Sequence, residues 1–176
     1  SWYIYPMTPK ALVVMVMLAA ACPAQEAPPI LPSTRIWGTA PHSAFTDIVR
    51  WKGYFVCTFR EGSGHIPGTN GKARIIASAD GATWESWALL AEPGIDLRDP
   101  KVCVMPDGSL MVNCGGSDYS DGLQGWHTRV AFSADGKTWT PPRRVRGIPA
   151  DNWFFRLTWH DGVGYCMPNI TDADPK

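Results

Sequence analysis

Charged side chains recur where short apolar stretches run into loops. They lie at Thr46-Asp47, at Arg98-Asp99-Pro100, at Phe155-Arg156 and in the stretch that carries Arg60, Glu61 and His65. Carboxyl groups can exchange protons with a reacting bond, and guanidinium groups present planar donors to a carboxylate or to sugar hydroxyls. The candidate catalytic residues are therefore Asp47, Glu61 and Asp99, and the candidate substrate-binding residues are Arg60, Arg98, Arg156 and His65.

The sequence contains no strong motif for binding a metal ion or a phosphate group. No pair of cysteines or histidines has the spacing of a metal-ligand motif, so we expect neither a metal nor another cofactor. The glycine-rich stretch 62–71 is not followed by a helical pattern, which argues against a phosphate-binding loop. The four cysteines after residue 24 are interpreted as small buried hydrophobic residues.

The composition limits the class of protein. The chain has 176 residues and equal numbers of basic and acidic residues, 16 of each, which argues against nucleic-acid binding through bulk charge. Hydrophobic residues make up 45% and charged residues 18%, so the chain has enough apolar material for a core. Together, 17 glycines, 16 prolines and 9 tryptophans indicate a turn-rich, all-β, secreted protein.

The first residues resemble a targeting segment rather than part of the fold. Lys10 precedes an apolar run from Ala11 to Ala21, and the small residue Ala24 follows, as in a bacterial secretory signal. The run is shorter than the roughly 20 residues of a membrane span, so we expect no stable span. Residues 1–24 are thus assigned to upstream residues and a signal peptide and residues 25–34 to a proline-rich linker, with a secreted or periplasmic location. Cys22 is a weaker candidate for lipid attachment.

The remaining chain contains a repeat of about 55 residues. Residues 78–84 and 133–139 share the pattern S-A-D-G-x-T-W and begin 55 residues apart. Strand-turn-strand patterns centred on Gly53, Gly108 and Gly162 follow nearly the same period. Glycine in such turns supplies the positive φ of a tight hairpin. Units of four short strands at this period predict a β-propeller over residues 35–176.

The S-A-D-G-x-T-W segments have a structural explanation. The aspartate can accept hydrogen bonds from the backbone of its own turn, and the glycine permits the bend. We expect Trp84 and Trp139 to fold back as largely buried plugs between strands. These segments are therefore predicted to belong to the scaffold rather than to an active site.

These turns resemble the Asp-box, or BNR, repeat of the sialidase superfamily, whose fold is a six-bladed β-propeller. The stretch from Ala44 through Phe59-Arg60-Glu61-Gly62 also resembles the first inner hairpin of a sialidase blade. The 152 residues after Ala24 correspond to about 2.8 such blades, so the chain is interpreted as an N-terminal fragment. The resemblance implies a sialidase-like exo-glycosidase that binds a glycan or a small sugar and hydrolyses its terminal sugar.

Two alternatives remain open. Arg98-Asp99-Pro100 resembles the R-D-P motif of five-bladed β-fructosidase and arabinosidase propellers, and this resemblance implies that Asp47 is a nucleophile or base and that Asp99 holds sugar hydroxyls. The other alternative is a carbohydrate-binding propeller without catalysis. Whether the chain is an enzyme at all is therefore left open by its sequence.

Overall fold

The structure is a computed structural model that describes residues 32–65 and 70–170. The chain divides into two units, Ser1–Thr34 and Arg35–Lys176, and only the second is described below. The predicted signal peptide at 1–24 lies outside the described residues, as does nearly all of the predicted linker at 25–34. In the part of the chain that the structure describes, no helix is long and apolar enough to cross a membrane.

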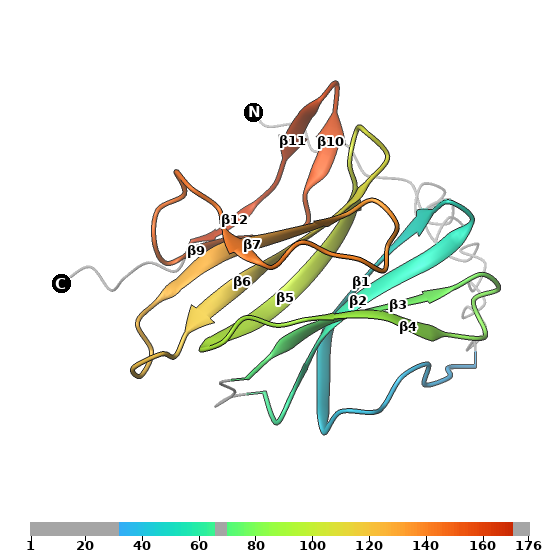
Figure 1. The fold of residues 1–176 in the computed structure, drawn as a ribbon, viewed down its shortest axis with the longest axis horizontal. Helices are drawn as coiled ribbons and strands as arrows, with labels where there is room; N and C mark the ends of the chain where they lie inside the picture. The colour runs from blue at the N-terminus through green and yellow to red at the C-terminus, as the bar shows by residue number, and fades with distance from the viewer. Residues whose placement is uncertain (1–31, 66–69, 171–176) are drawn as a thin grey trace, which may run out of the picture. The chain divides into compact units, whose positions relative to one another are not determined.

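The first sheet is a four-stranded antiparallel blade in the order β1-β2-β3-β4 (Figure 1). Its strands are β1 (His42–Trp51), β2 (Tyr54–Gly62), β3 (Lys72–Ser78) and β4 (Glu85–Leu90). The second blade repeats this meander with β5 (Ile95–Val104), β6 (Leu110–Asp118), β7 (Trp126–Ser133) and the short β8 (Arg143–Arg144). Two successive meanders confirm the all-β prediction, and they are consistent with part of a β-propeller.

The third unit differs from the first two. A hairpin of β10 (Thr158–His160) and β11 (Val163–Tyr165) forms about Gly162, as the repeat predicts. The preceding strand β9 (Asn152–Phe154), however, pairs in parallel with β7 and antiparallel with β12 (Pro168–Ile170), so it extends the sheet of the second blade. Figure 1 shows the β10–β11 hairpin projecting away from that sheet.

The glycine turns form as predicted. Gly53, Gly108 and Gly162 lie between consecutive antiparallel strands with φ values of 86°, 81° and 76°. The residues before two of them, Lys52 and Asp161, also have positive φ, 47° and 48°. Two successive residues at positive φ define the type I′ turn, whose twist matches that of the strands it joins.

The two Asp-boxes close in the same way. The Oδ1 atom of Asp80 accepts hydrogen bonds from the backbone N–H groups of Ala82 and Thr83, at 2.8 and 2.7 Å. Asp135 accepts from the equivalent groups in the second box at the same two distances. Trp84 and Trp139 each donate through Nε1 to the glycine carbonyl of their own turn. Both rings are partly buried and pack against the hydrophobic clusters, in line with their predicted role as plugs.

The main core lies between the two blades. One face of the first blade contributes Val56, Ile75 and Ala77, and the second blade contributes Leu97, Val102, Leu110 and Val112, among others. A smaller cluster of Cys57, Phe59 and Ile76 lies on the other face of the first blade, against Trp37 and Trp84. Cys57, Cys103 and Cys114 are buried free thiols, as expected of small hydrophobic residues, and Cys166 is free but only half-buried.

Candidate functional site

The first strand of each blade contains a β-bulge. In β1 the register shifts between Ala44 and Asp47, and in β5 it shifts between Arg98 and Lys101. The two bulges hold non-glycine residues at positive φ: Phe45 at 63° and Asp99 at 48°. A bulge re-aims a side chain, and a strained φ at a non-glycine residue is retained where the surrounding structure enforces it. The R-D-P segment thus holds Asp99 on a β-bulge with a left-handed backbone conformation.

Asp99 is partly buried without a partner. Among the described residues, no hydrogen bond or ion pair holds its carboxyl group. Burial raises the pKa of Asp99 above the usual 3.8, although the positive charges of Lys101, Arg98, His65 and Arg60 act in the opposite direction. A partly buried, unpaired carboxyl group surrounded by cations is a combination that clusters at functional sites.

A buried ion-pair cluster lies beside Asp99. Arg60 and Asp96 are both fully buried, and Arg60 Nε lies 2.8 Å from Asp96 Oδ1. The other carboxylate oxygen of Asp96 lies 3.3 Å from Nη1 of Arg98, whose side chain is 11% exposed. Gly71 packs directly on the Arg60–Asp96 pair, because a Cβ atom at Gly71 would lie 1.8 Å from Asp96 Oδ1. The guanidinium of Arg60 is therefore enclosed rather than presented to a ligand.

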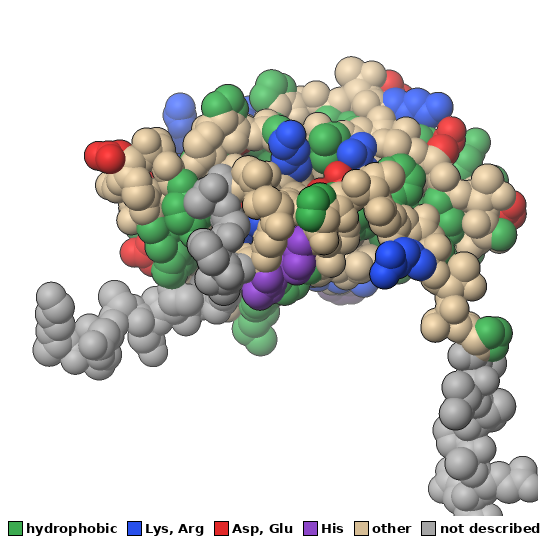
Figure 2. All heavy atoms as spheres, turned by 90° about the horizontal axis from the view of Figure 1, so that it is seen from below, with side chains coloured by type: hydrophobic (Ala, Val, Ile, Leu, Met, Phe, Trp, Pro, Cys, Tyr) green, Lys and Arg blue, Asp and Glu red, His purple; other side chains and the backbone are tan. Residues whose placement is uncertain are grey.

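The segment after β2 is tied to this cluster. Arg60 Nη1 donates to the carbonyl oxygen of Gly64 at 2.9 Å, and Arg98 Nη2 donates to that of His65 at 3.2 Å. The His65 ring lies 5.4 Å, centre to centre, from the rings of both His42 and Phe45. Histidine side chains adjoin each other on the face seen in Figure 2. His65 thus lies beside Arg98, but its backbone rather than its ring contacts that residue.

Asp47 and Arg156 form a separate pair. Their charged groups lie 2.9 Å apart, with the Arg156 side chain 49% exposed and that of Asp47 12% exposed. Asp47 also accepts a hydrogen bond from the backbone N–H of Val102 at 3.0 Å, and Arg156 donates to the Ile48 carbonyl at 2.7 Å. This pair therefore links β1, β5 and the segment after β9.

Glu61 lies elsewhere, and its predicted position in the cluster is wrong. Its Oε2 atom accepts two hydrogen bonds from Arg74, at 3.1 and 2.9 Å, and its Oε1 atom accepts one from Trp37 at 2.7 Å. Successive residues of a strand point to opposite faces, so Glu61 must point away from Arg60. Burial alone would raise the pKa of Glu61, but the hydrogen bonds from Arg74 and Trp37 outweigh it and lower that pKa. This carboxylate is unsuited to donating a proton.

Six of the seven predicted residues thus form two groups rather than one, and Glu61 lies apart from both. Arg60, Arg98, His65 and Asp99 lie together, and Asp47 pairs with Arg156. Asp96 holds the first group together. It was not predicted as a site residue, because the sequence around an aspartate in an apolar strand does not indicate which residues will pair with it. In the described part of the chain, no group of three or more histidine, cysteine, aspartate or glutamate residues could hold a metal ion.

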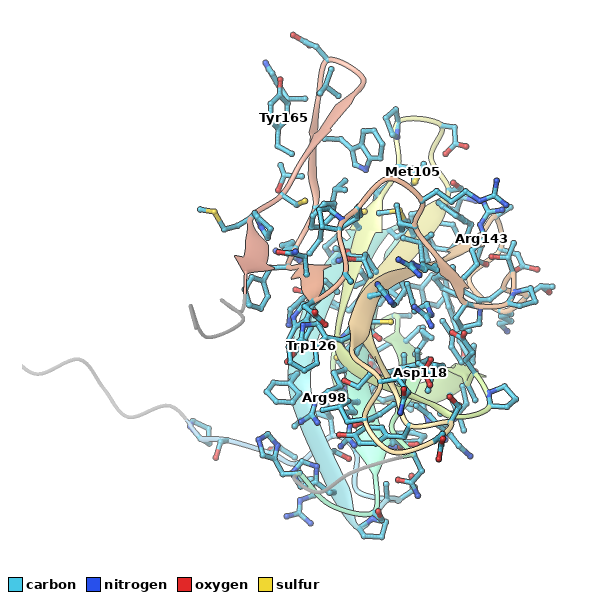
Figure 3. All side chains as sticks on the ribbon, turned by 90° about the vertical axis from the view of Figure 1, so that its left-hand side faces the viewer. Arg98, Met105, Asp118, Trp126, Arg143 and Tyr165 are labelled. Atoms are coloured by element: carbon cyan, nitrogen blue, oxygen red, sulfur yellow. The ribbon has the colours of Figure 1, made fainter. Side chains whose placement is uncertain are left out.

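Tryptophans flank the first group. Arg98 is paired in register with Gly115 on β6, and the indole ring of Trp153 lies over that glycine, where a Cβ would approach it to 2.8 Å. Trp153 in turn packs edge-to-face against Trp126, with ring centres 5.9 Å apart. Figure 3 shows Arg98 and Trp126 towards one end of the strands and Met105 at the other end. The cluster is therefore at the end of the blades where β5 begins.

Comparison with known proteins supports the fold but does not show a family. No protein-family model matches the chain, and no curated protein matches its sequence. A GH32 β-fructofuranosidase from Bombyx mori resembles it with a TM-score of 0.51 at 13% identity, over 85% of this chain and 34% of that chain. A protein of unknown function from Dyadobacter fermentans resembles it with a TM-score of 0.49 at 23% identity, over 58% of this chain and 36% of that one.

The chain spans about a third of the length of these structures. At these identities the likeness concerns the fold alone: an all-β arrangement consistent with part of a β-propeller, of the kind found in glycoside hydrolases. The sialidase type and the number of blades in a ring do not follow from it.

Proposed function

We propose that this chain is part of a β-propeller glycosidase that hydrolyses a terminal sugar of a glycan, with Asp99 at the reacting centre. The observation that carries the proposal is the Asp99 carboxyl group, which is partly buried on a strained bulge, lacks a partner among the described residues and has a raised pKa. Convergent charged groups around such a carboxyl are typical of an active site.

The two groups of charges suit the two roles of glycoside hydrolysis. The reaction needs one carboxylic acid that protonates the leaving oxygen and one charged carboxylate that acts as base or nucleophile. Asp99, whose pKa is raised, is proposed as the acid, and Asp47, ion-paired with Arg156, as the carboxylate. Arg98 and His65 are proposed to bind the sugar beside Asp99. Glu61 takes no part, because Arg74 and Trp37 occupy its oxygens.

Two substrate types are candidates. The Arg98-Asp99-Pro100 bulge and the fold likeness to a β-fructofuranosidase favour a neutral terminal sugar such as a fructoside or an arabinoside. The two complete Asp-boxes favour the sialidase type, with a six-bladed ring and an acidic sugar. Because Arg60 is enclosed by Gly71 and occupied by Asp96, it is a poor clamp for a substrate carboxylate, and we place the neutral sugar first. Export through the N-terminal apolar segment is part of the same proposal.

A panel of chromogenic fructosides, arabinosides and sialosides tests this proposal. The complete protein that contains this chain is expected to hydrolyse one of the three, and Asp99→Asn in that protein is expected to reduce the rate by about 10²- to 10⁴-fold. The Asn variant keeps the size of the side chain, so its melting temperature should stay close to that of the wild type. Hydrolysis that survives in Asp99→Asn contradicts the assignment. Sugar binding without hydrolysis by the wild type indicates a binding propeller instead.

A further inference from the structure

The ion-pair cluster beside Asp99 is centred on Asp96, whose side chain is fully buried. We propose that Asp96 is the positioning residue of this site: it holds Arg60 on one carboxylate oxygen and Arg98 on the other, and thereby sets both the placement of Arg98 and the charge around the Asp99 carboxyl group. The inference deepens the proposed function and rests on it for the role of Asp99.

The geometry makes Asp96 the centre of the cluster. Its two oxygens lie 2.8 Å from Arg60 Nε and 3.3 Å from Arg98 Nη1, and its side chain is fully buried. Each arginine then donates to a backbone carbonyl of the segment after β2, at Gly64 and at His65. Removing the Asp96 charge would therefore leave each arginine with a backbone carbonyl as acceptor but without its paired negative charge.

The local charge balance gives Asp96 a second effect. The charged groups that act on Asp99 come from several elements: Lys101 and Arg98 on β5, Arg60 on β2 and His65 in the segment after β2. The neighbouring thiol of Cys114 on β6 is neutral at ordinary pH, because burial raises its pKa to about 12. Asp96 supplies the negative charge directly paired with the two arginines. With Asp96 neutral, Asp99 would face the full field of those cations, and nearby cations favour the charged form of a carboxyl group.

The test is the pKa of Asp99, measured by NMR titration of side-chain carboxyl carbons. The Asp99 signal is assigned by its loss in Asp99→Asn. In Asp96→Asn, the pKa of Asp99 is expected to fall by about 1 unit or more, as for an aspartate that gains an unbalanced neighbouring cation. In Arg98→Gln it is expected to move in the opposite direction, because a cation beside Asp99 is lost. A shift of opposite sign in the two variants is an outcome that loss of structure alone would not produce.

A matched control is available in the second blade. Glu92 pairs with the buried Arg129 at 2.8 Å, so Glu92→Gln also removes a carboxylate from a buried arginine but leaves the Asp96 cluster intact. That variant should leave the pKa of Asp99 unchanged. An unchanged Asp99 pKa in a folded Asp96→Asn protein, or an equal shift in the Glu92 control, overturns the inference. If Asp96→Asn does not fold, Asp96→Ser, which also removes the charge, takes its place, and an unchanged Asp99 pKa in that variant overturns the inference.

The titration also separates this inference from the proposed function. Opposite pKa shifts in a complete protein that hydrolyses no glycoside would support the role of Asp96 and refute the glycosidase proposal. The opposite outcome is hydrolysis that depends on Asp99 while the pKa of Asp99 is unchanged in Asp96→Asn. It would support the glycosidase proposal and refute the role of Asp96. If both hold, the limb of the pH–rate profile that reports Asp99 should move to lower pH in Asp96→Asn.

Discussion

Replacing Arg60 by alanine should destabilise the protein strongly, although Arg60 was predicted from the sequence to bind substrate. Its side chain and that of Asp96 are both fully buried. Removing one partner of a buried ion pair leaves an uncompensated charge and costs about 3–5 kcal/mol of unfolding free energy. Because Asp96 keeps a second partner in Arg98, at 3.3 Å, we expect the lower end of this range, about 3 kcal/mol.

Arg156→Ala is the control for this measurement. Arg156 also pairs with an aspartate at 2.9 Å, but its side chain is 49% exposed. Ion pairs that reach solvent typically contribute about 0–1 kcal/mol. Asp47 is itself only 12% exposed, but the exposed Arg156 side chain makes this variant less costly than Arg60→Ala. The comparison therefore separates the effect of burial from the effect of losing an arginine.

Urea denaturation followed by tryptophan fluorescence gives the unfolding free energies of both variants. For a domain near 150 residues, 1 kcal/mol corresponds to about 3 °C in melting temperature, so Arg60→Ala should melt about 9 °C below the wild type. If the unfolding free energy of Arg60→Ala falls by less than about 1 kcal/mol, or by no more than that of Arg156→Ala, then the buried Arg60–Asp96 pair does not stabilise the fold.

Two further predictions concern the turns. Gly136→Ala should lower the unfolding free energy more than Gly108→Ala, by about 1–3 kcal/mol of overpacking. Both glycines have positive φ, but only a Cβ atom at Gly136 would meet Trp87, at 2.4 Å. Equal losses of unfolding free energy in urea denaturation would contradict the packing of the second Asp-box. Hydrogen bonds from the backbone N–H of Thr138 and its neighbour lower the pKa of Asp135 from 3.8 to about 2. Since the folded-state pKa lies below the unfolded one, this stabilisation is complete above pH 4 and is lost as the pH falls towards 2. The melting temperature of the wild type should therefore fall more steeply than that of Asp135→Asn over this range, and parallel curves would refute the assignment.

The local features of this fold could be predicted from the sequence because each is closed by residues that are neighbours in the chain. A type I′ turn needs only a residue such as Lys52 followed by glycine, and an Asp-box needs only the aspartate and the backbone of the next few residues. The 55-residue period then fixed where the hairpins recur. The parallel pairing of β9 with β7 joins residues far apart in the sequence, and no local pattern indicates it.

The site was predicted less completely, for two different reasons. Arg60 and Glu61 are adjacent in a strand, so strand alternation alone already excluded one shared cluster, and that signal was present in the sequence. Asp96 gave no such signal. Its partners come from β2 and from its own strand, and only the packing of one blade against the other brings Arg60 to it.

The two bulges carry different residues although the backbone repeats. Both inner strands carry an extra residue at positive φ, but the first blade has Phe45 there and the second has Asp99. The phenylalanine packs its ring near His65 and contributes no charge, whereas the aspartate brings an unpaired carboxyl group to the same end of the blades. The repeat thus supplies two equivalent strained positions, and the residue type at each decides whether a ring or a carboxyl group is placed there. The neighbouring carboxylates of Asp96 and Glu61 are held by arginines, whereas no hydrogen bond or ion pair among the described residues holds the Asp99 carboxyl group.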